Sequence, residues 1–232
     1  MRDRILRRWR RFWIGLSGPC GFGRIAARIA ALGTQPYHGR AFLSYLHPRG
    51  FVAPTASVSH PALQMGKNVY IGDRVIATRE KDGGPLELHD RVQIYGDAFI
   101  QTGYGASIRI GEETHIQPGC HLHACLSDIE IGRYVEIAPC CAFYSYDHGT
   151  APGITIMSQP IESKGPIRIG DGAWLGHAVI ILAGVHVGAG AVIGAGSVVA
   201  RDIPAGAIAV GTPARVVKYR EPIRTVGLSL QY

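Results

Sequence analysis

A six-residue repeat of aliphatic side chains dominates the second half of the chain. An aliphatic residue returns at every sixth position without a slip, at Ile169, Leu175, Ile181, Val187, Ile193 and Val199. Four residues after each of these aliphatic residues comes a second small or branched residue, at Ala173, Val179, Val185, Ala191, Ser197 and Ile203. Neither the helical period of 3.6 nor strand alternation gives a repeat of six. The Gly-rich stretches between these positions favour frequent sharp turns.

The same repeat occurs upstream in three shorter blocks. The repeated aliphatic positions are Leu88, Ile94 and Ile100, then Ile110, Ile116 and Leu122, then Ile131, Ile137 and Phe143. The positions four residues later are Val92, Ala98, Thr114, Cys120, Leu126, Val135 and Cys141. One hexad per side and three sides per turn predict a triangular prism of short parallel strands, an all-β solenoid in which each coil packs on the next. Register slips at 104–109, 127–130 and 149–168 predict loops that leave the prism.

The two ends of the chain lack this repeat. We expect a basic, aromatic and partly helical segment at 1–55, with a helix at 23–32 whose Ile25, Ile29 and Leu32 share one face. The β-helix is expected over 56–210, with its first clear coil near Ile71 and an excursion loop at 149–165. Residues 211–232 are expected to form a short C-terminal cap, since "ARVVKYREP" after Pro213 has a short helical pattern.

Composition fits one domain of this kind. The chain has 232 residues, of which 47% are hydrophobic and 31 are Gly, so it can bury a core and is neither disordered nor collagen-like. No run approaches the roughly 18 apolar residues that a spanning helix needs. Five Cys without a CxxC pair predict neither a disulfide framework nor a zinc site. Cys120 and Cys141 fall on inward positions and are expected to pack there. These features suit a cytoplasmic protein.

The positive charge is concentrated at the N-terminus. Residues 1–11 hold six Arg and one Asp, whereas the remaining chain is nearly neutral, so we expect no nucleic-acid-binding surface. Apolar and aromatic residues alternate with these arginines, and a helix over 1–16 therefore suits the surface of an anionic membrane. The same helix could instead pack its apolar side on the body or on a neighbouring subunit. The sequence leaves both alternatives open.

The hexads fail at one place where chemistry is expected. The small apolar position after Phe143 is occupied by Asp147, and His148 and the loop 149–165 follow. A neutral imidazole near pH 7 can take a proton from a hydroxyl or amine, so His148 is the candidate general base. Asp147 is a weak candidate for orienting the ring, because neighbouring side chains on a strand point in opposite directions. Glu162 in the loop is the alternative partner.

A metal site is not expected. His115, His121 and His123 lie close together in one block, which raises the possibility of a zinc site like that of the gamma-class carbonic anhydrases. In that family two zinc ligands lie five residues apart in a GH…H arrangement. Here Gly176 and His177 supply the first part, but the residue five positions later is Leu182. The second ligand is missing.

Residues 143–218 resemble the hexapeptide-repeat acyltransferases, in particular the maltose, galactoside and Nod-factor O-acetyltransferase branch and its polysaccharide-modifying relatives. The residues that carry the resemblance are "YSYDHG" and "GPIRIGDGAWLGHAVIILAGVHVGAGAVIGAGSVVARDIPAGAIAVGTPARVVK". The resemblance implies a homotrimer of left-handed parallel β-helices that uses acetyl-CoA, with active sites between neighbouring prisms and His148 as the catalytic base.

The resemblance also implies how acetyl-CoA would bind. Trp174 would line the cleft wall, and a backbone N–H near Gly176 and His177 would stabilise the oxyanion. The remaining implied contacts are backbone groups of Ala195 and Ala200 along the pantetheine arm, and Arg201, Arg215 and Lys218 at the CoA phosphates. The departures are that His177 replaces a small polar residue, Arg201 replaces a commoner Lys, and the first 50 residues do not match the branch.

The sequence therefore predicts an acetyl-CoA-dependent O-acetyltransferase that acts on a hydroxyl of a saccharide or glycan precursor by direct transfer. The same scaffold could instead N-acetylate an amino-sugar nucleotide. A non-catalytic trimeric scaffold is the alternative from another class. The expected location is the cytoplasm, and the alternative in which the N-terminal helix binds lipid places the protein at the inner face of the membrane.

Overall fold

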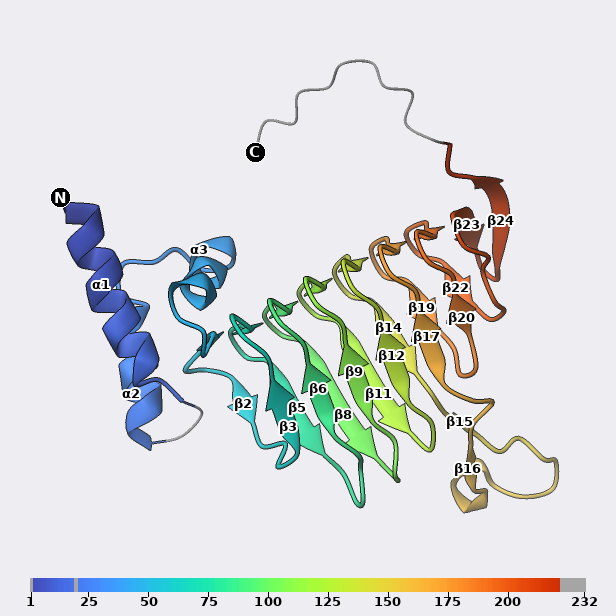
Figure 1. The fold of residues 1–232 in the computed structure, drawn as a ribbon. Coiled ribbons are helices and arrows are strands. Elements are labelled where there is room, and N and C mark those ends of the chain that lie inside the picture. Colours follow the sequence, from blue (N-terminus) through green and yellow to red (C-terminus); the bar gives the residue numbers. More distant parts are fainter. Residues whose placement is uncertain (1, 19–20, 222–232) are drawn as a thin grey trace.

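The computed structural model describes residues 2–18 and 21–221, and its body is a three-sided parallel β-solenoid (Figure 1). Face A comprises β1 (Phe51–Val52), β4 (Tyr70–Ile71), β7 (Gln93–Ile94), β10 (His115–Ile116), β13 (Glu136–Ile137), β18 (Trp174–Leu175), β21 (Val192–Ile193), β23 (Ala207–Gly211) and β24 (Ala214–Tyr219). Face B comprises β2 (Ser57–Val58), β5 (Ile76–Arg79), β8 (Phe99–Gly103), β11 (His121–Cys125), β14 (Ala142–Tyr144), β19 (Ile180–Ile181) and β22 (Val198–Val199). Face C comprises β3 (Leu63–Met65), β6 (Leu86–Leu88), β9 (Ile108–Ile110), β12 (Ile129–Ile131), β17 (Ile167–Ile169) and β20 (His186–Val187).

The hexad residues fill the interior of the prism, as the repeat predicts. All six repeated aliphatics from Ile169 to Val199 are buried, and so are the small residues four positions after them. Leu126 is the exception: it is 41% exposed, and its φ of 62° places it in a turn. The reason is that β11 continues through Cys125, so Ala124 takes the next inward position and the chain turns only afterwards.

The solenoid begins at Phe51, before the predicted boundary at 56 and well before the coil near Ile71. Strand β1 pairs in parallel with β4, so residues 51–65 form a complete first coil. Val52 and Val58 are six residues apart, but both are only partly buried against the core. This coil is hard to see in the sequence because the N-terminal helices, rather than a preceding coil, cover its end.

An N-terminal cap covers that end of the solenoid. It comprises α1 (Arg2–Gly15), α2 (Gly21–Ala30), α3 (His38–Ala41) and the 3-10 helix η1 (Phe42–Leu46). In α2 the buried residues are Ala26, Ala27 and Ala30, whereas Ile25 and Leu32 are exposed. The predicted helix is therefore present, but its buried side is formed by alanines, and of the predicted aliphatic face only Ile29 is half-buried. Close approach to α1 favours small side chains on the packed side.

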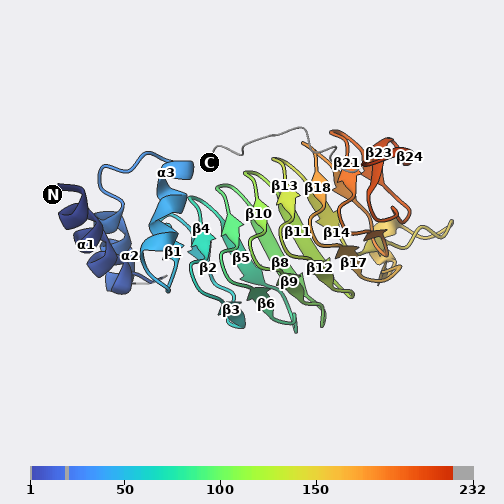
Figure 2. The same ribbon diagram turned by 45° about the horizontal axis from the view of Figure 1, so that its top comes forward.

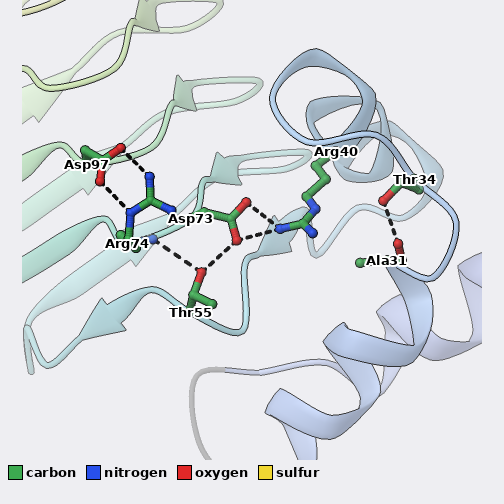
Figure 3. A network of polar contacts seen from close by, with 7 residues as sticks. All are labelled: Ala31, Thr34, Arg40, Thr55, Asp73, Arg74 and Asp97. Atoms are coloured by element: carbon green, nitrogen blue, oxygen red, sulfur yellow. Dashed lines mark hydrogen bonds and ion pairs between the residues drawn. The ribbon is translucent and has the colours of Figure 1, made fainter.

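Polar contacts fix the cap to the first two coils (Figure 3). A guanidinium nitrogen of Arg40 lies 2.6 Å from the Asp73 carboxylate, which also accepts a hydrogen bond of 2.7 Å from the Thr55 hydroxyl. Next to this cluster, Arg74 donates two hydrogen bonds of 2.6 Å to Asp97 in the following coil. The Arg40–Asp73 pair is partly buried, so it defines how the cap sits on the prism.

The opposite end is closed by strands rather than by the predicted short helix. Strands β23 and β24 form an antiparallel hairpin at the edge of face A, with Ile208 opposite Lys218 and Val210 opposite Arg215. The edge strand β23 offers unpaired backbone groups, and pairing with them outweighs a weak helical pattern. Residues 222–232 of the predicted cap lie outside the described residues. Across residues 2–18 and 21–221, no helix combines the length and apolar content needed to cross a membrane.

Candidate active site

The break in the repeat forms a two-stranded antiparallel arm between faces B and C. Strand β15 (Asp147–His148) pairs with β16 (Ile161–Glu162), and the arm extends from the solenoid beyond β14 (Figure 1). Its base is clamped by buried Ser145, whose hydroxyl accepts from the Cys125 N–H at 2.9 Å and donates to the Ser127 carbonyl at 2.6 Å. The Ser163 hydroxyl in turn donates to the Ser145 carbonyl at 2.6 Å. The excursion is therefore a fixed ribbon at its base.

His148 is exposed on this arm, beside a depression of about 340 Å³ lined by Asp147, His148, Thr150, Glu162, Ser163 and Lys164. The register pairs Asp147 with Glu162 and His148 with Ile161. Paired residues of an antiparallel ribbon share a face, so both carboxylates lie on the side opposite to His148. Asp147 instead lies 3.7 Å from the Lys164 ammonium. Within the described residues, neither carboxylate hydrogen-bonds to the His148 ring.

One aromatic neighbour of His148, Tyr146, escaped the sequence argument. The Tyr146 ring lies edge-on to the His148 ring, with centroids 6.5 Å apart, and its hydroxyl lies 3.3 Å from Nδ1 of His123. Burial lowers the pKa of His123 and raises the pKa of the Tyr146 phenol. The signal that could have revealed Tyr146 is alternation, because Tyr146 and His148 are two residues apart and share one side of an extended chain.

The predicted site residues lie at two different corners of the prism. His148 and the arm occupy the corner between faces B and C, and exposed Ala200 and Arg201 follow β22 at the same corner. Gly176, His177 and Ala195 occupy the corner between faces A and B. Exposed Trp174 lies on face A, and exposed Arg215 and Lys218 lie on its edge strand β24. A single chain therefore does not bring the two groups together, since all of face B separates them.

The corner between faces A and B carries backbone donors. The Gly176 N–H donates to the Ile193 carbonyl at 2.8 Å, so it is already engaged. The N–H groups of His177 and Ala195 have no acceptor among residues 2–18 and 21–221. The equivalent residues of the two preceding coils are Pro118 and Pro139, which have no N–H to satisfy. Of the two predicted oxyanion donors, Gly176 and His177, only His177 therefore has a backbone N–H without an acceptor among the described residues.

Gly176 has a structural reason to be glycine. A Cβ atom there would lie 2.7 Å from the Ala195 nitrogen of the next coil, and real Cβ atoms do not approach backbone so closely. The Gly176 carbonyl accepts a hydrogen bond from the Cys141 thiol at 3.2 Å, inside the prism. Cys120 and Cys141 are both fully buried there, as the repeat predicts.

The three clustered histidines lie on two faces. His115 on face A has its Nδ1 3.2 Å from Glu136, whereas His121 and His123 are on face B. In the described part of the chain, no group of three His, Cys, Asp or Glu side chains is arranged to hold a metal ion.

The buried hexads agree with a comparison of the sequence with known families. Residues 166–201 match the family described as bacterial transferase hexapeptide (six repeats). The repeat extends in space beyond the matched residues, because the coils from β1 onward stack in the same parallel register.

Two relatives are similar to about half of this chain. A Dictyostelium discoideum protein named as an acetyltransferase is 39% identical over 126 residues, which are 54% of this chain and 65% of that protein. Nodulation protein L of Rhizobium meliloti is 41% identical over 113 residues, which are 49% of this chain and 60% of that protein. The chain thus spans less than two thirds of the length of either relative.

Two solved structures resemble the hexapeptide-repeat solenoid. The polySia specific acetyltransferase NeuO has 26% identity and a TM-score of 0.53, over 72% of this chain and 76% of that one. AntD, an N-acyltransferase from Bacillus cereus in complex with dTDP-4-amino-4,6-dideoxyglucose and coenzyme A, has 21% identity and a TM-score of 0.53, over 72% and 84%. The predicted fold, a left-handed parallel β-helix, is confirmed.

Proposed function

We propose that this protein is an acetyl-CoA-dependent O-acetyltransferase that acts on a hydroxyl of a saccharide or glycan precursor. The observation that carries the proposal is the pairing of two features on one scaffold. An exposed imidazole, His148, is held on a clamped ribbon beside a depression, and a free backbone N–H, at His177, lies at another corner of the same prism. The similarity to proteins named as acetyltransferases supports the reaction class.

In the proposed mechanism, His148 takes the proton of the acceptor hydroxyl as the oxygen attacks the acetyl carbonyl carbon. The His177 N–H donates to the oxyanion of the tetrahedral intermediate. The C–S bond then breaks, the coenzyme A thiolate leaves, and the proton on His148 returns to the thiolate or to water. No acyl-enzyme is required, since Cys120, Cys125, Cys140 and Cys141 lie outside the arm. Cys20 lies outside the described residues.

The residues that would hold acetyl-CoA fit a long anionic ligand. Arg201, Arg215 and Lys218 are exposed, and among the described residues none of the three is paired with a carboxylate. Cations of this kind suit the CoA phosphates. Exposed Trp174, with the backbone at Ala195 and Ala200, would contact the pantetheine arm and the thioester end. Asp147 and Glu162 line the depression beside His148 and would contact the acceptor rather than the ring.

A homotrimer is part of the proposal because the site is incomplete in one chain. If the corner between faces B and C of one copy meets the corner between faces A and B of the next, His148 and His177 face each other across the contact. A cyclic arrangement of three prisms repeats that heterologous contact and closes it. The tip of the arm supports a contact with a neighbour, since Ile154 is 58% and Met157 is 96% exposed.

One specific observation favours the alternative of N-acetylation. AntD, an N-acyltransferase in complex with a 4-amino sugar nucleotide, shares the fold of this chain. The same imidazole could take a proton from an amine after attack on the thioester. The product distinguishes the two, since an O-acetyl ester is cleaved by mild alkali and an amide is not. A non-catalytic trimeric scaffold would bind no acetyl-CoA.

The deciding experiment follows thiol release from acetyl-CoA with panels of sugars, nucleotide sugars and lipid-linked glycans, and identifies the product by mass spectrometry. We expect His148→Ala to lose about 10²–10⁴-fold in kcat, while calorimetry still detects coenzyme A binding. The matched control is His186→Ala, because His186 is also exposed but lies on face C. Near-normal turnover in His148→Ala would contradict the assignment of the base. If the wild type did not bind coenzyme A, the non-catalytic trimeric scaffold would be the remaining hypothesis.

A further inference from the structure

Helix α1 has two apolar sides, and only one of them is used in packing. Ile14 is fully buried in the cap cluster, and Trp13 packs against the same cluster. At 100° per residue, Ile5, Trp9 and Phe12 gather on the side of α1 opposite Ile14, and Leu16 directly follows the helix. Ile5 and Phe12 are 63% and 62% exposed, and Trp9 and Leu16 are exposed as well. We call these four residues the outward face of α1.

A row of arginines lies beside the outward face. Arg4, Arg8 and Arg11 follow the same helical spacing and are all exposed. None of the α1 arginines from Arg4 to Arg11, whose side chains the structure describes, forms an ion pair with a carboxylate. Arg7 and Arg10 differ from this row, because they contact the protein. The Arg7 guanidinium lies 5.7 Å from the centre of the Phe42 ring, and Arg10 donates to the Leu32 carbonyl at 3.3 Å.

The position of α1 leaves its outward face accessible. In both views α1 is the outermost element at the cap end of the solenoid, and the arm extends near the other end (Figures 1 and 2). The C-terminal end of α1 is tied to the body, since Arg49 donates to the Gly15 carbonyl at 2.9 Å. A flat partner can therefore meet the outward face without displacing the cap.

We propose that the outward face of α1 docks the protein on an anionic lipid bilayer. Ile5, Trp9, Phe12 and Leu16 would enter the boundary between headgroups and acyl chains, and Arg4, Arg8 and Arg11 would meet anionic headgroups. The helix of 14 residues is about 21 Å long. Because this is shorter than the hydrocarbon core of about 30 Å, the helix lies on the membrane.

A second copy of the chain is a poorer occupant of the same face. In a twofold contact the same surface meets itself, so two uncompensated arginine rows would be brought close together. Like charges at such a contact repel each other. Anionic headgroups supply the complementary charge instead. This inference is independent of the proposed reaction, because the outward face shares no residue with the arm or with the coenzyme A contacts.

The test is sedimentation of the full chain with vesicles of phosphatidylcholine, alone or with about 30% phosphatidylglycerol. We expect binding to the anionic vesicles only, and a loss of binding between about 0.1 M and 0.5 M salt. The double variant Ile5→Gln/Phe12→Gln should lower the ratio of bound to free protein by about tenfold or more. Its control is Met157→Gln, which removes an even more exposed apolar side chain on the arm.

A charge variant tests the arginine row separately. Arg4→Gln/Arg8→Gln should weaken binding to the anionic vesicles by about tenfold or more. Lys67→Gln/Lys81→Gln, which removes two exposed cations from the body, should leave binding unchanged. Equal binding to neutral and anionic vesicles, or no binding, would overturn the proposal. A change of oligomeric state in Ile5→Gln/Phe12→Gln without vesicle binding by the wild type would assign the face to a second copy.

Discussion

The backbone N–H of His177 is available because of its position in the coil. The turn at this corner places residue 177 before Ala178, whose φ is 56°, and the equivalent turns have Pro139 before Cys140 and Pro118 before Gly119, also with positive φ. Proline is favoured at the first central position of a turn whose second central residue has positive φ. The fold therefore accepts a residue without an N–H at this corner.

A substitution by proline can therefore remove the backbone N–H of residue 177 without disturbing the turn. We expect His177→Pro to fold normally and to lose about 10²–10³-fold in kcat, as is usual when one oxyanion donor is removed. His177→Ala keeps the N–H and should keep most of the turnover. The measurement is kcat from thiol release, with thermal unfolding as the check on folding. Equal activity of the two variants would show that another group stabilises the oxyanion.

His60 illustrates how one buried imidazole links the fold to pH. Its Nε2 lies 2.8 Å from the Thr102 hydroxyl, which itself donates to the Gly84 carbonyl at 2.9 Å, so the ring must donate from Nε2. Nδ1 is buried and has no partner within the described residues. Burial lowers the pKa of His60, and the positive charge of Arg79 lowers it further. The folded state therefore favours the neutral ring.

The sign of the resulting pH dependence follows from that shift. The unfolded chain, with an ordinary His pKa of about 6.5, binds more protons than the folded chain just below that pH. We expect the contribution of His60 to the free energy of unfolding to be constant above about pH 7 and to fall toward pH 5.5. His60→Gln, which can still donate to Thr102, should reduce this fall, whereas exposed His186→Gln should not. Urea unfolding at several pH values measures the free energy of unfolding. Identical pH profiles for the wild type and His60→Gln would refute the claim that His60 causes the fall.

At the scale of elements, the sequence predicted the repeated coils and a helix of the N-terminal cap, but it missed the first coil and the strand form of the C-terminal cap. The hexads identify the interior of the prism because inward positions must be apolar in every coil. The first coil and the C-terminal hairpin lie at the ends, where packing partners differ from those of an inner coil. The helical pattern after Pro213 was overridden there, since the edge of β23 offered hydrogen bonds that a helix would leave unpaired.

In the arm, too, the local sequence pattern was predictable and the strand pairing was not. The break at Asp147 locates the arm and the exposed His148 from sequence alone. The partner of Glu162 could not be predicted, because it depends on the register in which β15 and β16 pair. The pairing places Glu162 opposite Asp147 and leaves Tyr146 as the aromatic neighbour of His148.

At the scale of the whole molecule, the proposed lipid contact and the arm lie at different heights along the prism. Face B contains four coil spacings between β2, next to the cap, and β14, which precedes the arm. With about 4.8 Å between stacked strands, the arm base lies roughly 19 Å above the first coil. A chain docked through α1 would therefore hold His148 clear of the headgroups, within reach of a glycan that extends from the surface.

The division of the site between two corners leads to a prediction about mixed oligomers. In the proposed trimer, each site takes His148 from one chain and the His177 N–H from its neighbour. His148→Ala and His177→Pro are each expected to be nearly inactive alone. When the two variants are unfolded together in equal amounts and refolded, about one site in four combines an intact His148 with an intact neighbouring N–H, so about a quarter of the wild-type activity should return.

The controls of this mixing experiment separate assembly from chemistry. Mixing the folded variants without unfolding should restore little activity, because the trimers do not exchange chains while they stay assembled. Each variant refolded alone should stay inactive, which excludes a gain from refolding itself. If both corners served one site within a single chain, every chain in the mixture would carry one defect and no activity would return. Recovery near a quarter therefore requires a site shared between copies, as the separation of the two corners by face B indicates.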